Sequence, residues 1–222
     1  MRVHPALSLS SILVVVGLSA WELPLAAQYQ LPSRAKQYES GWENDRVRVR
    51  KISVAPGAAM PVQADADRIL VYLTADLQNR IPEAEAIWQP AGTGNLENRG
   101  RFNVEAIAVE LKNASPGDVR ITPPEALPVD GMVDARVLID NPRVIVTRLR
   151  YFSNTYAADP WHFHPQDGII VYLRGGNPWV PYDAWEASRV RRGDIAVLPA
   201  NTFHSFGNTG GDPLEFLVIF PK

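Results

Sequence analysis

The chain has 222 residues, a formal net charge of −2 and a hydrophobic share of 46%. This balance gives no reason to expect nucleic acid or an anionic membrane as a partner, because both are bound through an excess of Lys and Arg. Cysteine is absent, which excludes disulfides, thiolate metal ligands and nucleophilic thiol chemistry.

Residues 1–27 have the features of a signal peptide: Arg2 near the start, a short apolar stretch over 6–21, and small residues around Ala26 and Ala27. A membrane-spanning helix needs about 20 apolar residues, and this stretch is shorter and interrupted by serines. An uncleaved anchor and a buried helix are the alternatives. We expect a secreted or periplasmic protein without a membrane contact after cleavage. The polar segment 28–40 is predicted to be a linker or an N-terminal arm.

The rest of the chain is predicted to be all-β. The full sequence contains nineteen prolines and fifteen glycines, and the segments between them after residue 40 are short and rich in β-branched and aromatic residues, a composition typical of strands. The predicted strands are 47–52, 69–73, 104–111, 143–151, 169–173, 194–198 and 214–220. No segment keeps a helical period over three turns, although 76–88 could include one short helical turn. A sandwich or barrel is expected.

The two halves of the chain resemble each other in four blocks that occur in the same order. The pairs are 43–52 with 140–149, 69–76 with 169–176, 88–100 with 197–210, and 104–112 with 213–222. This order predicts a duplicated domain, with one unit at 41–112, a connection at 113–135 and a second unit at 136–222.

After removal of the signal peptide, which contains His4, the remaining histidines are His162, His164 and His204. Residues i and i+2 of a strand point to the same face, so His162 and His164 can both reach a metal at 2.0–2.1 Å. His204 follows a proline turn, and a neighbouring strand could bring it beside the pair. A hydrogen-bonded polar cluster without metal is the alternative.

These positions resemble the motifs of the cupin superfamily. In the first motif, G-x5-H-x-H-x3,4-E-x6-G, the histidines match His162 and His164, and the closing glycine matches Gly175. In the second, G-x5-P-x-G-x2-H-x3-N, the matches are Gly193, Pro199, His204 and Asn208, with Asn201 in place of the inner glycine. The resemblance implies two cupin-type antiparallel β-barrels (jelly rolls) in one chain, a bicupin, with a metal in the C-terminal barrel.

The sequence also departs from these motifs. Tyr156 replaces the opening glycine, and Gly168 stands where the family has its acidic ligand. Asp167 could act as a fourth ligand if a bulge turned it inward; otherwise the site consists of histidines with open positions, as in some cupin oxygenases. The first unit has no histidine. Its first-motif positions fall on Gln63 and Asp65, or on Val62 and Ala64 in the other register, and its second-motif histidine position falls on Gly94. We expect a degenerate barrel there.

Several residues near the second motif pair are candidates for a ligand pocket. They are Trp161, Tyr172, Arg148, Arg150 and Asn208, with Tyr151, Phe206 and Trp179 as further aromatic candidates and Tyr182, Trp185 and Glu186 in a loop that could cover the site. Core packing for the aromatic residues and a solvated strand face for the arginines are the alternatives.

The resemblance therefore favours an exported, metal-dependent enzyme of dioxygenase type that acts on a small molecule. Iron(II) is the favoured metal, and manganese, nickel, copper or zinc also suit imidazole ligands. The alternative is a non-catalytic small-ligand-binding or structural envelope protein in which the metal is structural or absent. A homodimer is compatible with each of these functions.

Overall fold

The computed structural model describes residues 37–38, 41–59, 65–93, 97–112, 131–156, 158–179 and 189–222. Strands, turns and loops make up this part of the chain, and it contains no helix that is long and apolar enough to cross a membrane. The expected signal peptide, most of the connection at 113–135, and the loop with Tyr182, Trp185 and Glu186 lie outside the described residues.

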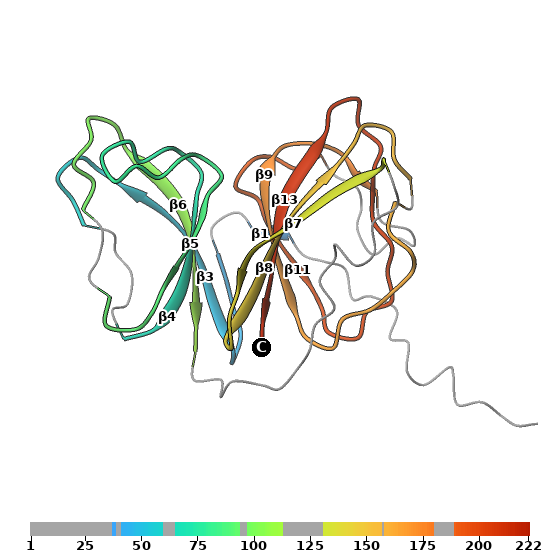
Figure 1. Cartoon of the computed structure of the whole chain (residues 1–222), viewed down its shortest axis with the longest axis horizontal. Coiled ribbons are helices and arrows are strands. Elements are labelled where there is room, and N and C mark those ends of the chain that lie inside the picture. The colour runs from blue at the N-terminus through green and yellow to red at the C-terminus, as the bar shows by residue number, and fades with distance from the viewer. Residues whose placement is uncertain are drawn as a thin grey trace, which may run out of the picture.

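The first half forms a five-stranded antiparallel sheet (Figure 1). Its order is β2 (Gly41–Glu43), β3 (Val47–Val54), β6 (Val104–Leu111), β4 (Asp67–Tyr72) and β5 (Ala86–Gln89). The predicted strands at 47–52, 69–73 and 104–111 are confirmed. The short helical turn expected within 76–88 is not formed, because a hydrogen-bonded turn from Leu77 to Arg80 leads instead into β5.

The second half forms a six-stranded antiparallel sheet and a two-stranded ribbon. The sheet order is β1 (Gln37–Tyr38), β11 (Ile195–Leu198), β9 (Gly168–Arg174), β13 (Leu214–Pro221), β8 (Val144–Tyr151) and β7 (Val133–Asp140), and the ribbon pairs β10 (Pro178–Trp179) with β12 (Gly207–Asn208). The strands predicted at 143–151, 169–173, 194–198 and 214–220 are confirmed. β1 comes from the predicted N-terminal arm, and β7 begins inside the predicted connection. Neither large sheet is closed by hydrogen bonds among the described strands, so the class is all-β with open antiparallel sheets.

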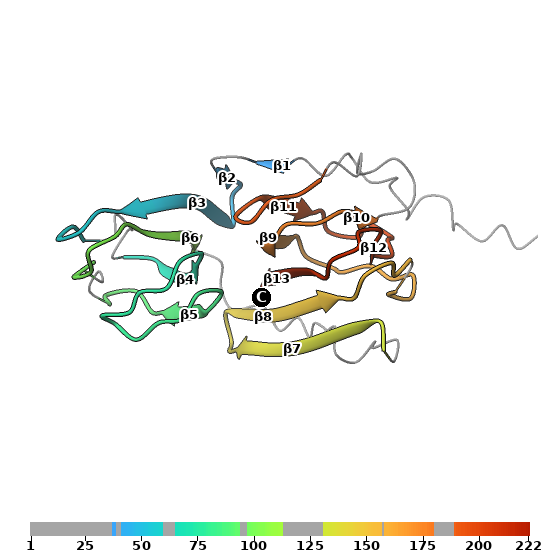
Figure 2. The ribbon, with the colours of Figure 1, turned by 90° about the horizontal axis from the view of Figure 1, so that it is seen from above.

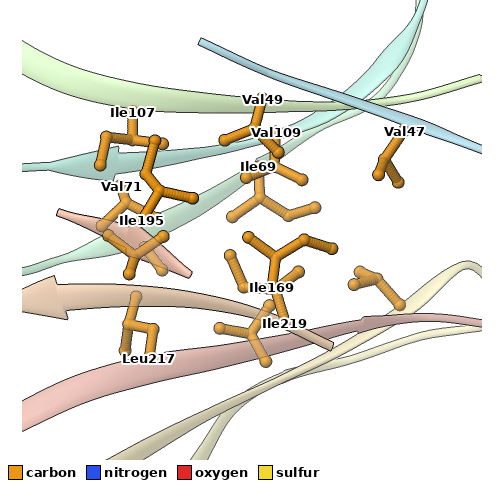
Figure 3. Packing of buried hydrophobic residues seen from close by; sticks show 14 of the residues in the cluster. Val47, Val49, Ile69, Val71, Ile107, Val109, Ile169, Ile195, Leu217 and Ile219 are labelled. Atoms are coloured by element: carbon orange, nitrogen blue, oxygen red, sulfur yellow. The ribbon is translucent and has the colours of Figure 1, made fainter. Parts of the chain in front are cut away.

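The two large sheets pack against each other through a shared apolar core (Figures 2 and 3). In β9, Ile169 and Val171 face this shared core, whereas Ile170 and Tyr172 face a second core inside the C-terminal half. The first half likewise has a core of its own behind β4 and β6. Because both faces of the central strands are buried, these strands have continuous apolar sequences and little polar alternation.

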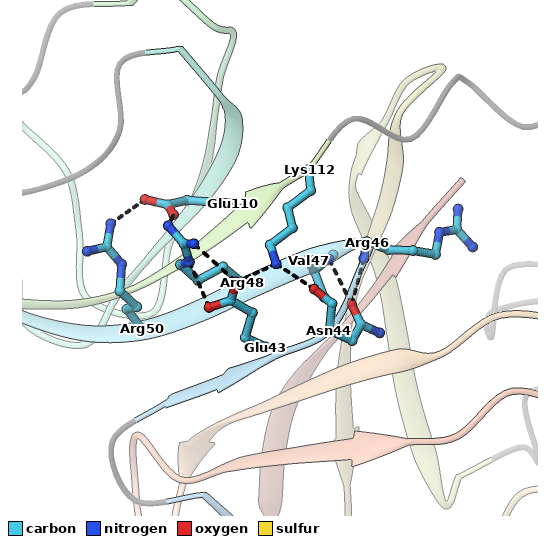
Figure 4. Close-up of polar contacts among 8 residues, drawn as sticks. All are labelled: Glu43, Asn44, Arg46, Val47, Arg48, Arg50, Glu110 and Lys112. Atoms are coloured by element: carbon cyan, nitrogen blue, oxygen red, sulfur yellow. Dashed lines mark hydrogen bonds and ion pairs between the residues drawn. The ribbon is translucent and has the colours of Figure 1, made fainter.

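Turns at equivalent places in the two halves make the same hydrogen bonds. The Asn44 side chain accepts from the amides of Arg46 and Val47, at 2.9 and 2.8 Å (Figure 4). Asn141 accepts from Arg143 and Val144, at 2.8 and 3.0 Å. Asn98 donates to the carbonyl groups of Val54 and Phe102 and accepts from Gly100. Asn208 does the same with Phe152, Asp212 and Gly210.

The halves are also joined by a reciprocal pair of arginine contacts. Arg46 of the first half donates to the carbonyl oxygen of Lys222 at 3.1 Å, and Arg143 of the second half donates to that of Lys112 at 3.3 Å. Lys112 and Lys222 each follow the last strand of their half. Each half therefore makes the same contact with the end of the other.

Candidate metal centre

The backbone places two of the histidines directly opposite each other. His162 donates its amide to the carbonyl of His204 at 2.9 Å, and His204 returns the bond at 2.8 Å. The His164 carbonyl accepts from Asn201 at 2.6 Å, and Asn201 lies in the turn before His204 with a positive φ of 57°. This turn brings the second motif back beside the first.

The three imidazole rings converge. The Nε2 atoms of His162 and His164 lie 3.1 Å apart, and one ligand atom from each of His162, His164 and His204 lies within 4.8 Å of the others. Two nitrogens bound to one metal at about 2.1 Å, with an angle near 90–110°, would be about 3.0–3.4 Å apart. The pair His162–His164 already has this separation, and a modest movement of His204 would complete the set.

Backbone carbonyl groups fix two of the rings. The Nδ1 of His162 lies 2.7 Å from the Pro160 oxygen, and the Nδ1 of His204 lies 2.8 Å from the Thr202 oxygen. A carbonyl only accepts, so each Nδ1 carries the proton and each Nε2 keeps its lone pair. This is the outer-shell arrangement that orients metal-binding histidines.

Burial keeps the inner two histidines neutral. His164 and His204 are 8% and 6% exposed. Burial, with the neighbouring His162 and His204, lowers the pKa of His164 to about 3. Burial and His162 lower the pKa of His204 to about 4. Metal ligation requires neutral imidazole, so both side chains are ready to bind a metal at neutral pH.

Phe220 fills the space beside Gly168, where the motif has its acidic residue. A Cβ atom built on Gly168 would lie 2.7 Å from Cε1 of Phe220, and the Phe220 ring centroid lies 4.4 Å from that of His164. A carboxylate side chain at 168 would require this ring to move. In place of an acidic side chain at position 168, the chain therefore has the aromatic ring of Phe220, which packs on His164.

Asp167 lies outside the three-histidine group. Its carboxylate accepts from the Ala200 amide at 2.8 Å and from the Asn44 side chain at 3.1 Å. Asp67 in the first half accepts from the Ala91 amide at the same distance, 2.8 Å. The half without histidines has the same bond, which indicates that the bond serves the structure and not a metal. The interpretation of Asp167 as a fourth ligand therefore gains no support.

At the place of Gly168 and Phe220, the first half carries charged residues. Arg68 is paired in register with Glu110, and Glu110 also contacts Arg50 at 2.5 Å and Arg48 at 3.8 Å (Figure 4). Arg68 is fully buried and donates to Gln89 and to the Thr93 carbonyl. The first half therefore has an ion cluster here, in which the buried Glu110 contacts two partly exposed arginines.

The pocket candidates do not assemble around the histidines. Arg148 and Arg150 alternate with the core residues Leu149 and Tyr151 and so lie on the other face of β8; Arg148 pairs with Glu215 at 2.5 Å. The other candidates make packing or loop contacts. Tyr172 and Phe206 pack against Phe216, and Asn208 bonds within its turn. Trp161 stacks on Phe203, and Trp179 packs against Tyr156.

Sequence reasoning missed two polar residues that lie close to His162 and His164 along the chain. Asp159 accepts a hydrogen bond from the Tyr151 hydroxyl; burial raises the pKa of Asp159, while that bond and the neighbouring His162 oppose the rise. Gln166 is 4% exposed, and neither of its side-chain amide atoms has a hydrogen-bond partner. The spacing His162-x-His164-x-Gln166 was the available signal for the second residue.

Comparisons with known proteins identify the domain and the fold that contain these histidines. Residues 155–220 match the family model of the cupin domain, whereas no curated protein matches. A cupin 2 conserved barrel domain protein from Leptotrichia buccalis is similar in structure, with 16% identity, a TM-score of 0.54 and coverage of 87% of this chain and 91% of that one. An oxalate decarboxylase from Bacillus subtilis has 13% identity and a TM-score of 0.55 over 87% and 78% of the two chains. A salicylate 1,2-dioxygenase from Pseudaminobacter salicylatoxidans has 9% identity and a TM-score of 0.56 over 85% and 76%. Residues 155–220, which contain all three histidines of the cluster, therefore match the cupin domain, and the chain as a whole has a fold similar to that of cupin proteins.

Proposed function

We propose that the protein binds a divalent first-row metal ion, iron(II) by preference, through the Nε2 atoms of His162, His164 and His204. The observation that carries this proposal is the contact of the Nδ1 atoms of His162 and His204 with backbone carbonyl oxygens, which leaves each Nε2 to face the cluster with its lone pair. Manganese, nickel, copper and zinc accept the same ligands.

We further propose a metal-dependent enzyme of dioxygenase type that acts on a small molecule. A bound ion would supply Lewis-acid or redox chemistry. The chain itself contributes three neutral ligands and, with Gly168 and Phe220, an aromatic wall in place of a carboxylate. The salicylate 1,2-dioxygenase among the structural neighbours is an example of this reaction class on a similar fold.

A non-catalytic envelope protein is the second candidate. The 3.1 Å contact between the Nε2 atoms of His162 and His164 also serves as a hydrogen bond within a metal-free cluster. In that case the cluster would be structural, and the protein would bind a small ligand or act as a structural homodimer.

Two cupin units are proposed for the whole chain, a degenerate one at 41–112 and the histidine-containing one at 136–222, joined by 113–135. The paired asparagine turns and the reciprocal arginine contacts support a duplication. Export to the periplasm or the medium is proposed from the sequence of residues 1–27 alone.

Metal analysis of the protein, purified without a histidine tag, tests the metal proposal. We expect near-stoichiometric metal in the wild type and a loss of it in His162→Ala and His204→Asn. The asparagine amide can replace the Nδ1–H bond to the Thr202 carbonyl but offers no imidazole lone pair, so it separates ligation from folding. A wild type that stays metal-free after incubation with each of the five ions would contradict the proposal.

A further inference from the structure

We propose that Gln166 completes the metal centre as a fourth, neutral ligand through its side-chain oxygen Oε1. This inference rests on the proposed metal site. It assigns the place of the missing carboxylate to an amide two residues after His164, where the motif has no ligand.

The first argument is the unsatisfied amide. Gln166 is 4% exposed, and both Oε1 and Nε2 lack a hydrogen-bond partner. Buried polar groups are nearly always paired, and an orphaned one indicates an absent water, ion or ligand. Two orphaned atoms on one side chain destabilise the fold, so a partner that binds them is expected.

The second argument is the position in the chain. From His162 to Gly168, burial alternates: His164, Gln166 and Gly168 are buried, whereas Phe163 and Pro165 are exposed. Gln166 thus follows the two histidines on the inner side of this segment. The next inner position, Gly168, has no side chain, and Phe220 lies beside it, so Gln166 is the inner position after the histidines in this segment that offers a ligand oxygen.

The third argument comes from the other half. Asp67 and Asp167 make the same bond to Ala91 and Ala200, which aligns the two segments at an offset of 100 residues. At that offset His162, His164 and Gln166 correspond to Val62, Ala64 and Ala66. The structurally bonded aspartate is kept in both halves, whereas the glutamine is present only in the half with the histidines.

The amide oxygen suits this role chemically. Oxygen ligands from neutral amides bind divalent ions, and they add no charge to the site. The Nε2 group of the same amide would remain free to donate to a second ligand of the metal. A three-histidine, one-amide centre is thus a dipositive site that favours an anionic substrate.

The test compares Gln166→Leu with Gln166→Glu in the full-length protein. Cobalt(II) is the probe, and its dissociation constant is measured by competition with a chelator. We expect Gln166→Leu to weaken binding on the order of 10–100-fold and to change the cobalt(II) visible spectrum, whereas Gln166→Glu binds as tightly as the wild type or more tightly. The unfolding midpoint of the metal-free Gln166→Leu protein should be unchanged or raised, because the variant removes the orphaned atoms.

Two results separate the failure of this inference from failure of the metal site. A wild type that binds no cobalt(II) contradicts both proposals. A wild type that binds, with an equal affinity and an equal spectrum in Gln166→Leu, contradicts only the role of Gln166. Asp167→Asn is the matched control, since its structural bonds predict no change in the cobalt(II) spectrum.

Discussion

At the scale of single residues, the candidate site consists of neutral groups. His164 and His204 are held neutral by burial, Gly168 removes the carboxylate, and Gln166 is an amide. A site of this kind binds metal more weakly than one with an acid, but it holds its ligands ready at neutral pH without competing protons.

The metal-free protein should lose stability as the pH falls below about 6.5. The pKa of His204 is about 4 in the folded protein and about 6.5 in the unfolded chain, so the unfolded state takes up the proton first. The stabilisation is complete above pH 6.5 and declines as the pH falls toward 4, by about 2 kcal/mol between pH 6.5 and pH 5 for this residue. Urea denaturation at the two pH values measures it.

His204→Asn is the control for this pH dependence. The variant lacks the titrating group, so its stability should fall less over the same interval. An equal loss in the wild type and in His204→Asn would show that other groups, such as His164, cause the effect.

At the scale of elements, the turns carry the similarity between the halves. Asn98 and Asn208 each hold a loop closed through bonds to two carbonyl groups and one amide. Both are buried, so in each half an asparagine amide pairs backbone groups of the loop that would otherwise lack a hydrogen-bond partner.

Alanine at either position should therefore destabilise the protein to a similar extent. Each variant leaves buried backbone groups unpaired, and we expect a loss of about 1–3 kcal/mol in unfolding free energy for Asn98→Ala and for Asn208→Ala. Asn103→Ala is the exposed control, with only a 3.4 Å contact to the Ser53 hydroxyl, and should change little. A negligible effect at Asn98 with a large one at Asn208 would argue against equivalent turns.

At the scale of the whole molecule, the apolar core between the sheets joins the halves. Ile69 and Ile169 are fully buried in it, one from each half (Figure 3). Neither half could expose this face to water without a large loss of hydrophobic burial. The halves should consequently unfold together.

Ile169→Ala should lower the stability of both halves at once. The cavity and lost burial cost about 2–5 kcal/mol, and hydrogen exchange measured by mass spectrometry should show faster opening of β6 and β13 alike. Leu77→Ala, at an 81% exposed position, is the control. Protection lost only in β13 would show that the halves are independent.

Much of the fold could be predicted from local pattern. The long strands at 104–111 and 143–151 contain several β-branched residues in a mostly apolar run, which gives a clear signal. The short strands β1, β10 and β12 could not be predicted, because two residues carry no period. Their pairing depends on distant partners, as in β1 with β11. The direction of Arg148 and Arg150 was equally undetermined, since it depends on which face of β8 is covered.

The sequence by itself determined the all-β class, the matching blocks and the three histidines, because strand propensity and motif spacing are local properties. Only the tertiary structure decided that Phe220 occupies the space beside Gly168, that Asp167 is bound to Ala200 and Asn44, and that the Gln166 amide is buried without a partner. Each of these depends on residues from segments far apart in the chain, and packing alone brings those segments together.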